Sequence, residues 1–160
     1  MQSLTDQHWM EQALLLADKA AAQGEIPVGA ILIKDNKVVG EGWNQSIGLH
    51  DPSAHAEMLA IRQGAKLLNN YRLPDTTLYV TLEPCSMCAG LLVHSRILRL
   101  VYGAADYKTG AAGSIMDLLN DQRLNHQVEV SSGVLAQQCG DKISQFFQMR
   151  RAQIKAAKQK

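Results

Sequence analysis

Apolar and polar residues repeat along this chain with two periods, one typical of helices and one typical of strands. The helical period begins after Thr5 and Asp6, either of which can cap a helix, and Gly24 ends it. We therefore expect an N-terminal helix with one buried face. The apolar residues of that face are Trp9, Ala13, Leu16, Ala17 and Ala20.

A hairpin is expected next in the chain. Residues 28–33 form a continuous apolar run, Asp35 and Asn36 are turn formers, and residues 37–43 return as a second strand. A loop rich in turn-forming residues then occupies positions 44–53.

Helices and strands alternate over the rest of the chain. Ser53 can cap the next helix, and Pro84 suits the first turn of the one after it. This order predicts an α/β protein with one domain over residues 1–160, built as a three-layer α/β/α sandwich around a mixed five-stranded sheet. The expected elements are a helix over 54–68, a strand over 77–82, a helix over 84–94, a strand over 98–102, a short helix near 116–119, a strand over 128–130 and a long helix from Leu135.

The composition is that of a globular protein, with 46% hydrophobic and 19% charged residues, which excludes disorder and a disulfide scaffold. The apolar runs are far too short to span a membrane, and residues 1–10 lack the features of a secretory signal. Two of the three cysteines are three residues apart, which favours a reducing compartment and a metal or redox site. We therefore expect a cytoplasmic protein that does not enter the membrane.

The net charge of +1 is unevenly distributed. Six basic residues and no acidic residue lie between Lys142 and Lys160, whereas the rest of the chain has ten basic and fifteen acidic residues. A basic tail of this kind favours an anionic partner, most commonly the phosphate backbone of a nucleic acid. The alternative is a solvated helix end, where the helix dipole favours cations.

Two short strings, 55-HAE-57 and 84-PCSMC-88, carry the candidate chemistry. Zinc prefers histidine nitrogen and cysteine thiolate as ligands. Cys85 and Cys88 would share one face at a helix start, where the dipole stabilises thiolates, and His55 would come from the start of another helix. Neither string offers a fourth ligand, so the fourth position would be left for water, as in a catalytic site.

Glu57 lies two residues after His55, where it could take a proton from a water at the metal and return it to a substrate. The pair H-x-E and P-C-x-x-C is typical of zinc-dependent nucleobase deaminases. A lone C-x-x-C could instead be a redox pair or half of a zinc ribbon. A redox pair would not need His55 and Glu57, and a ribbon would need a second C-x-x-C. Cys139 stands alone on an apolar helix face and is expected in the core.

Longer strings surround these motifs: PVGA (27–30), GEGWN (40–44), HDPSAHAE (50–57), LYVTLEPCSMCAG (78–90), KTGAAGS (108–114) and FFQMRR (146–151). From about Trp9 to Lys155 the chain resembles the bacterial tRNA-specific adenosine deaminases, a branch of the cytidine deaminase-like superfamily. The resemblance implies that superfamily's fold, one Zn2+ per subunit, and a homodimer that binds a tRNA anticodon stem-loop. It also implies hydrolysis of the wobble adenosine to inosine with release of ammonia, with Glu57 moving protons during attack on C6 of a flipped-out base.

The same resemblance implies roles for residues around the zinc strings. Asn44 would hydrogen-bond the base, and three residues would lie near the pocket wall: Val28, Ala56 and Leu82. Asp106 and Lys108 would contact the anticodon loop near the target nucleotide. Neighbouring nucleotides would be supported by Phe147, Arg150 and Arg151, because aromatic rings and arginines suit a splayed RNA loop.

Structural roles remain as alternatives for several of these residues. Val28 and Leu82 could be strand core, Asn44 could cap a turn, and Asp106 could bond within its own loop. The chain departs from the family pattern beside Asp106. Tyr107 replaces a residue that is often smaller, and Ala105 stands where some members carry arginine.

Two competing functions remain open from the sequence. A deaminase of a free small molecule, such as guanine or cytidine, would keep the zinc strings without needing the basic terminal helix. A non-catalytic RNA-binding subunit could keep zinc for its fold, but it would have no use for the Glu57 carboxylate.

Overall fold

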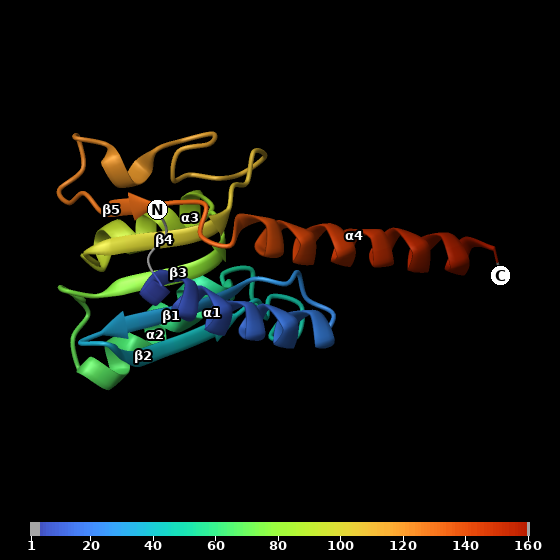
Figure 1. Cartoon of the computed structure of the whole chain (residues 1–160), viewed down its shortest axis with the longest axis horizontal. Helices are drawn as coiled ribbons and strands as arrows, with labels where there is room; N and C mark the ends of the chain where they lie inside the picture. The colour runs from blue at the N-terminus through green and yellow to red at the C-terminus, as the bar shows by residue number, and fades with distance from the viewer. Residues whose placement is uncertain (1–3, 160) are drawn as a thin grey trace.

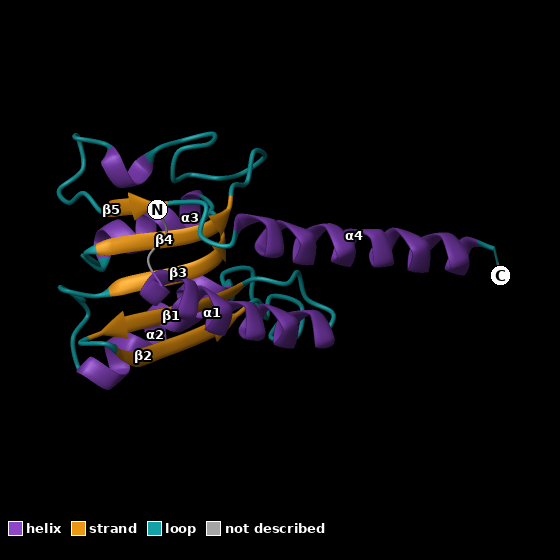
Figure 2. Ribbon diagram, in the orientation of Figure 1, coloured by secondary structure: helices purple, strands orange, loops and turns teal. Residues whose placement is uncertain are grey.

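The computed structural model describes residues 4–159 as a mixed five-stranded sheet with a layer of helices on each face (Figure 1; Figure 2). The predicted three-layer α/β/α fold is therefore confirmed. The strands are β1 (Gly29–Lys34), β2 (Lys37–Trp43), β3 (Thr77–Leu82), β4 (Arg99–Ala104) and β5 (Glu129–Ser131). The helices are α1 (Leu4–Ala22), α2 (Ala56–Leu68), α3 (Ser86–His94), the 3-10 helix η1 (Leu118–Asn120) and α4 (Ala136–Lys158).

The strand order β2-β1-β3-β4-β5 decides which segments meet at one edge of the sheet. β1 pairs antiparallel with both β2 and β3, whereas β3, β4 and β5 are parallel. The carboxyl ends of β2, β3 and β4 therefore lie at the same edge as the amino end of β1. The chain leaves β3 at this edge and enters α3 only a few residues later.

Each face of the sheet has its own apolar core. α1 and α4 cover one face, where Met10 and Cys139 belong to the same buried cluster as Ile31. α2 and α3 cover the other, where Ala60 and Leu92 belong to the same buried cluster as Leu32. Because β1 is covered on both sides, successive residues enter different cores, which explains why its sequence is continuously apolar.

Three of the predicted helix starts are wrong. The first helix already includes Leu4, and Asp6, inside it, binds the side chains of Arg99 and Tyr79 instead of capping. Ser53 does not cap α2, which begins at Ala56, because its hydroxyl donates to Asp51. Pro84 lies outside α3, because Cys85 is the N-cap.

Other expected features agree with the structure. Asp35 and Asn36 both have positive φ, as a tight hairpin turn requires. Gly24, with φ of 80°, follows α1. The short helix near 116–119 is the single turn η1, and Cys139 is buried as expected.

α4 extends well beyond the sheet, so that its later turns are surrounded by solvent (Figure 1). Its first half is held against α1 by a 2.7 Å ion pair between Lys142 and Asp18. Phe146 is buried, whereas Phe147 is 40% exposed. Within residues 4–159, no helix has both the length and the apolar character that a membrane span requires.

Candidate metal centre and active site

Three side chains that come from two facing helix starts form a compact cluster of metal-binding atoms. His55 is the N-cap of α2 and Cys85 the N-cap of α3, and Cys88 lies in the first turn of α3. α2 can approach β2 closely because Gly42 has no side chain. A Cβ at this position would lie 2.2 Å from the Ala56 carbonyl oxygen. The fold therefore holds His55 against the sheet edge where β3 delivers the cysteines.

The distances within this cluster match those of a tetrahedral zinc site. His55 Nδ1 lies 3.6 Å from the sulfur of Cys85 and 3.5 Å from that of Cys88, and the three donor atoms lie within 4.8 Å of one another. Zinc bonds of about 2.3 Å to sulfur and about 2.05 Å to nitrogen at tetrahedral angles put the two donors about 3.6 Å apart. The cluster fits one Zn2+ with Nδ1 as the histidine donor.

The two thiols have very different proton affinities. Hydrogen bonds from Cys88 and His55 lower the pKa of Cys85 to about 4, despite its partial burial. The hydrogen bond between the two cysteines, together with burial, raises the pKa of the Cys88 thiol. The hydrogen bond to Cys85 also raises the pKa of His55. The cluster therefore holds a thiolate before any cation binds, and a bound cation would favour the second.

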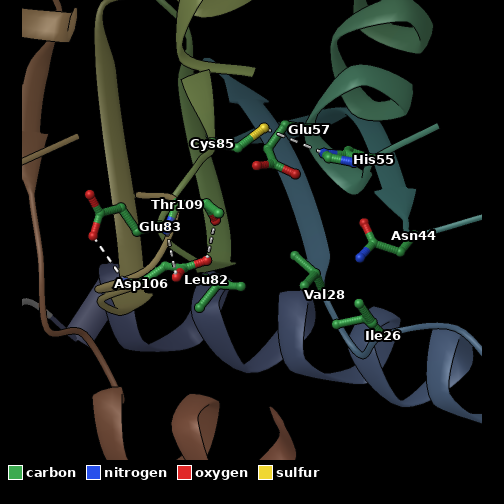
Figure 3. Close-up of a pocket in the computed structure, with 10 residues that line it drawn as sticks. All are labelled: Ile26, Val28, Asn44, His55, Glu57, Leu82, Glu83, Cys85, Asp106 and Thr109. Atoms are coloured by element: carbon green, nitrogen blue, oxygen red, sulfur yellow. Dashed lines mark hydrogen bonds between the residues drawn. The ribbon is translucent and has the colours of Figure 1, made fainter. Parts of the chain in front are cut away.

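Glu57 lies beside the cluster in the first turn of α2 and is only 4% exposed. Burial raises the pKa of this carboxyl to about 7, although a backbone hydrogen bond and the charge of His55 oppose the shift. Figure 3 shows the carboxylate between Cys85 and His55 on the cavity side. A carboxyl group whose pKa is near neutrality can both take and return a proton at physiological pH.

The cluster and Glu57 border a cavity of about 170 Å3. Drug-sized ligands usually occupy pockets of about 300 Å3 or more, so this cavity suits a single small ring system. The lining residues are Ile26, Val28, Asn44, His55, Glu57, Leu82, Glu83, Cys85, Asp106 and Thr109 (Figure 3).

Asn44 belongs both to the start of α2 and to the wall of the cavity. Its Oδ1 accepts a 2.9 Å hydrogen bond from the backbone N–H of Ala56, the first residue of α2. The side chain therefore satisfies the helix start that Ser53 was expected to cap. Because Oδ1 already accepts from Ala56, the amide nitrogen is the group that we expect Asn44 to present to the cavity, as a donor.

The expected wall residues have different positions. Val28 and Leu82 both line the cavity, and Val28 is also part of the core. Ala56 is fully buried and does not line the cavity, although its N–H fixes Asn44.

Asp106 both lines the cavity and holds its own loop. Its Oδ1 accepts the backbone N–H groups of Lys108 and Thr109 at 3.0 and 3.2 Å, and its Oδ2 accepts the Thr109 hydroxyl at 2.8 Å. The loop alternative is therefore confirmed, and the contact of Asp106 with the anticodon loop stays a prediction.

The structure separates the two arginines of α4. Lys108, Phe147 and Arg151 line a second hollow next to the loop. Arg150 instead donates to the Gly24 carbonyl oxygen at 3.4 Å and lies 5.4 Å from the centre of the Phe146 ring. The structure therefore brings Arg151, but not Arg150, together with Lys108 and Phe147.

Two buried carboxylates near the site were not predicted from the sequence. Glu25 accepts the backbone N–H groups of Ile47 and Gly48, which fastens the loop before α2. Glu83 does the same for the loop that carries Asp106. Their position directly before Ile-Pro and Pro-Cys, beside apolar strands, was the available signal, because an acidic residue there is rarely buried without a partner.

Comparison with known proteins gives the family. Residues 3–104 match the cytidine and deoxycytidylate deaminase zinc-binding region. A relative from Haemophilus influenzae, described as tRNA-specific adenosine deaminase, is 59% identical over 154 residues, 96% of this chain and 89% of the relative. The chain belongs to the tRNA-specific adenosine deaminase family.

Solved structures agree with membership of this deaminase family. A chain from a study of A-to-I editing by tRNA:A34 deaminases at the wobble position of transfer RNA is 40% identical, with a TM-score of 0.82. The match covers 84% of this chain and 98% of that chain. Guanine deaminase from Bacillus subtilis is 39% identical with a TM-score of 0.58, over 60% of this chain and 62% of that chain. The likeness to guanine deaminase is thus less extensive.

Proposed function

We propose that this deaminase hydrolyses adenosine to inosine at the wobble position of a tRNA anticodon loop and releases ammonia. The proposal rests on one observation: the His55, Cys85 and Cys88 cluster and the buried Glu57 meet in a ring-sized cavity, in a chain of the tRNA-specific adenosine deaminase family.

The residues around the cluster support a hydrolytic reaction. His55, Cys85 and Cys88 would hold one Zn2+ and leave a coordination position open. When bound, the ion supplies a Lewis acid that activates water for attack. Glu57 would accept a proton from that water, deliver it to the ring nitrogen next to the attacked carbon, and assist the departing amine.

The cavity walls support a purine as the base. Ile26, Val28 and Leu82 would contact the faces and edge of the ring. The Asn44 amide nitrogen would donate to an acceptor such as a purine ring nitrogen, because its oxygen is bonded to Ala56.

The second hollow supports an RNA substrate rather than a free base. Lys108 and Arg151 would contact phosphates, and the exposed Phe147 ring would stack on a nucleotide next to the target. Arg150 would support this surface by fixing α4 to the Gly24 carbonyl, and Asp106 by holding its loop.

We also infer that residues 1–160 form one domain and that the enzyme acts as a homodimer in the cytoplasm, where tRNA is found. An apolar hollow lined by Val93, Leu118 and Leu124 supports contact with a second copy. Sedimentation of the purified protein at micromolar concentration tests the homodimer.

The function is tested by inosine formation in a short RNA hairpin with adenosine at the wobble position, with free adenosine, cytidine and guanine assayed in parallel. Inosine in the hairpin with little turnover of the free compounds is expected. Turnover of a free compound but not of the hairpin would instead support the small-molecule deaminase.

A Glu57→Gln variant separates catalysis from a metal held only for the fold. We expect the variant to bind the same amount of zinc, to keep its melting temperature within a few degrees, and to form no inosine. Retained turnover would refute the role of Glu57 in moving protons.

A further inference from the structure

The carboxylate of Glu83 is the anchor of the loop over residues 105–114. It is 2% exposed, and none of the ion pairs within residues 4–159 involves it. Its oxygens accept four hydrogen bonds, all from this loop: Oε1 from the Asp106 N–H at 3.0 Å and the Ser114 hydroxyl, and Oε2 from the N–H groups of Ala112 and Ser114 at 2.9 and 3.1 Å. A buried carboxylate is tolerated when it is fully hydrogen-bonded in this way.

The same loop is also fixed to the chain around Cys85. The Ala111 N–H donates to the Pro84 carbonyl at 2.8 Å, and Gly110 forms an antiparallel bridge with Cys85. A Cβ on Gly110 would lie 2.4 Å from Cδ of Glu83, so only glycine fits against the carboxylate. The metal-binding segment and the loop are therefore tightly joined.

Side chains of this loop line both parts of the proposed RNA site, the cavity and the second hollow. Asp106 and Thr109 line the cavity, and Lys108 lines the second hollow beside α4. Figure 3 shows the Glu83 carboxylate turned away from Cys85 and His55 and toward Asp106. Glu83 is thus placed to hold the loop without touching the cluster.

We propose that Glu83 is a positioning residue: it sets where the 105–114 loop stands relative to the metal centre, and so determines how well the RNA around the target base is bound. This inference rests on the proposed function. The bonds that Asp106 makes within its loop fix the local turn. The Glu83 bonds fix where that turn lies against the cavity.

Glu83→Gln tests this with almost no change in shape. Glutamine has one acceptor oxygen and one amide nitrogen. The Ser114 hydroxyl can rotate and accept from the new nitrogen, but the Asp106 N–H cannot. The amide nitrogen therefore settles at the Oε1 position, and the bond to Asp106 is lost while the two Oε2 bonds remain.

Asp6→Asn is the matched control. Asp6 is also a buried carboxylate, bonded to Tyr79 and Arg99, and its loss should destabilise the protein. Arg99 begins β4, so this network lies at the opposite edge of the sheet from the cavity. A variant that only weakens the fold should behave as Asp6→Asn does.

Three measurements are made on the zinc-loaded variants: zinc content, hydrogen exchange of the 105–114 backbone, and kcat and KM on the hairpin. For Glu83→Gln we expect full zinc content, faster exchange in the loop, and a KM raised about 10-fold or more with kcat within about threefold, because binding to ground and transition states is lost together. For Asp6→Asn we expect an unchanged loop and KM.

Each contrary result is decisive. Loss of zinc in Glu83→Gln would assign the residue to the metal site, and an unchanged KM with unchanged loop exchange would show that the loop does not depend on it. If the unaltered protein forms no inosine in the hairpin, the proposed function fails. The exchange of the loop in the two variants would then still show whether Glu83 positions it.

Discussion

Exchanging Asn44 for alanine and for aspartate separates its bond at the start of α2 from its proposed bond to the substrate, because the two involve different atoms of one amide. Oδ1 accepts the Ala56 N–H at the start of α2, and Asn44 lines the cavity, to which its amide nitrogen could donate. Asn44→Ala removes both groups. Asn44→Asp keeps an acceptor for Ala56 but has no donor for a substrate.

The expected magnitudes differ between stability and activity. Loss of a helix-start acceptor costs about 1 kcal/mol, which lowers Tm by about 2–4 °C in a chain of this size. In Asn44→Asp this loss is absent, and the added negative charge at the N-terminus of α2 is favoured by about 0.3–1 kcal/mol. Both variants leave a buried acceptor of the base unpaired, which costs roughly 1–3 kcal/mol, or about 5- to 150-fold in kcat/KM.

Thermal unfolding and hairpin deamination, measured on the same zinc-loaded preparations, check this pair. We expect both variants to be impaired in kcat/KM and only Asn44→Ala to melt earlier. Wild-type activity in Asn44→Asp would refute the donor assignment, and an unchanged Tm in Asn44→Ala would refute the role at the helix start.

Three further predictions follow from the α4 surface, the Asp6 network and the metal cluster. Arg151→Ala should weaken hairpin binding and reduce the slope of log affinity against log salt by about 1. Arg150→Ala should leave that salt slope nearly unchanged, because Arg150 is bonded to the Gly24 carbonyl; equal slopes in the two variants would contradict their different placement. The hydrogen bond from Arg99 lowers the pKa of Asp6 in the folded state. The ionised Asp6 therefore contributes to the free energy of unfolding above about pH 4, and this contribution is lost as pH falls through the lowered pKa. Urea titrations at pH 7 and pH 3 should therefore show a smaller loss of stability on acidification in Asp6→Asn than in the wild type. Chelation of zinc should abolish deamination until zinc is restored. It should also expose Cys85, whose pKa is about 4, to alkylation at neutral pH before the buried Cys139 reacts. Peptide mapping identifies the modified cysteine, and equal labelling of Cys85 with and without zinc would argue against Cys85 as a ligand.

The local pattern of the sequence predicted the elements well and their starting residues poorly. Asp6 and Ser53 are both good capping residues, but each side chain bonds elsewhere, Asp6 to Arg99 and Ser53 to Asp51. A capping residue predicts a helix start only when no stronger partner competes for its oxygen. Arg99 is 93 positions from Asp6, and no local rule could have anticipated it.

The sequence by itself determined the three metal-binding residues and the order of helices and strands along the chain. The ligand residues His55, Cys85 and Cys88 follow from residue type and from the pattern within two short strings, and the alternation of apolar segments follows from the periods of helix and strand. Only the tertiary structure decided which groups surround that cluster. The bond from Ala56 to Asn44, the anchoring of the Asp106 loop by Glu83, and the different surroundings of Arg150 and Arg151 all depend on segments far apart in the chain. Side-chain hydrogen bonds are made within about 3 Å, so the packing of the sheet and its helices had to bring these partners together first.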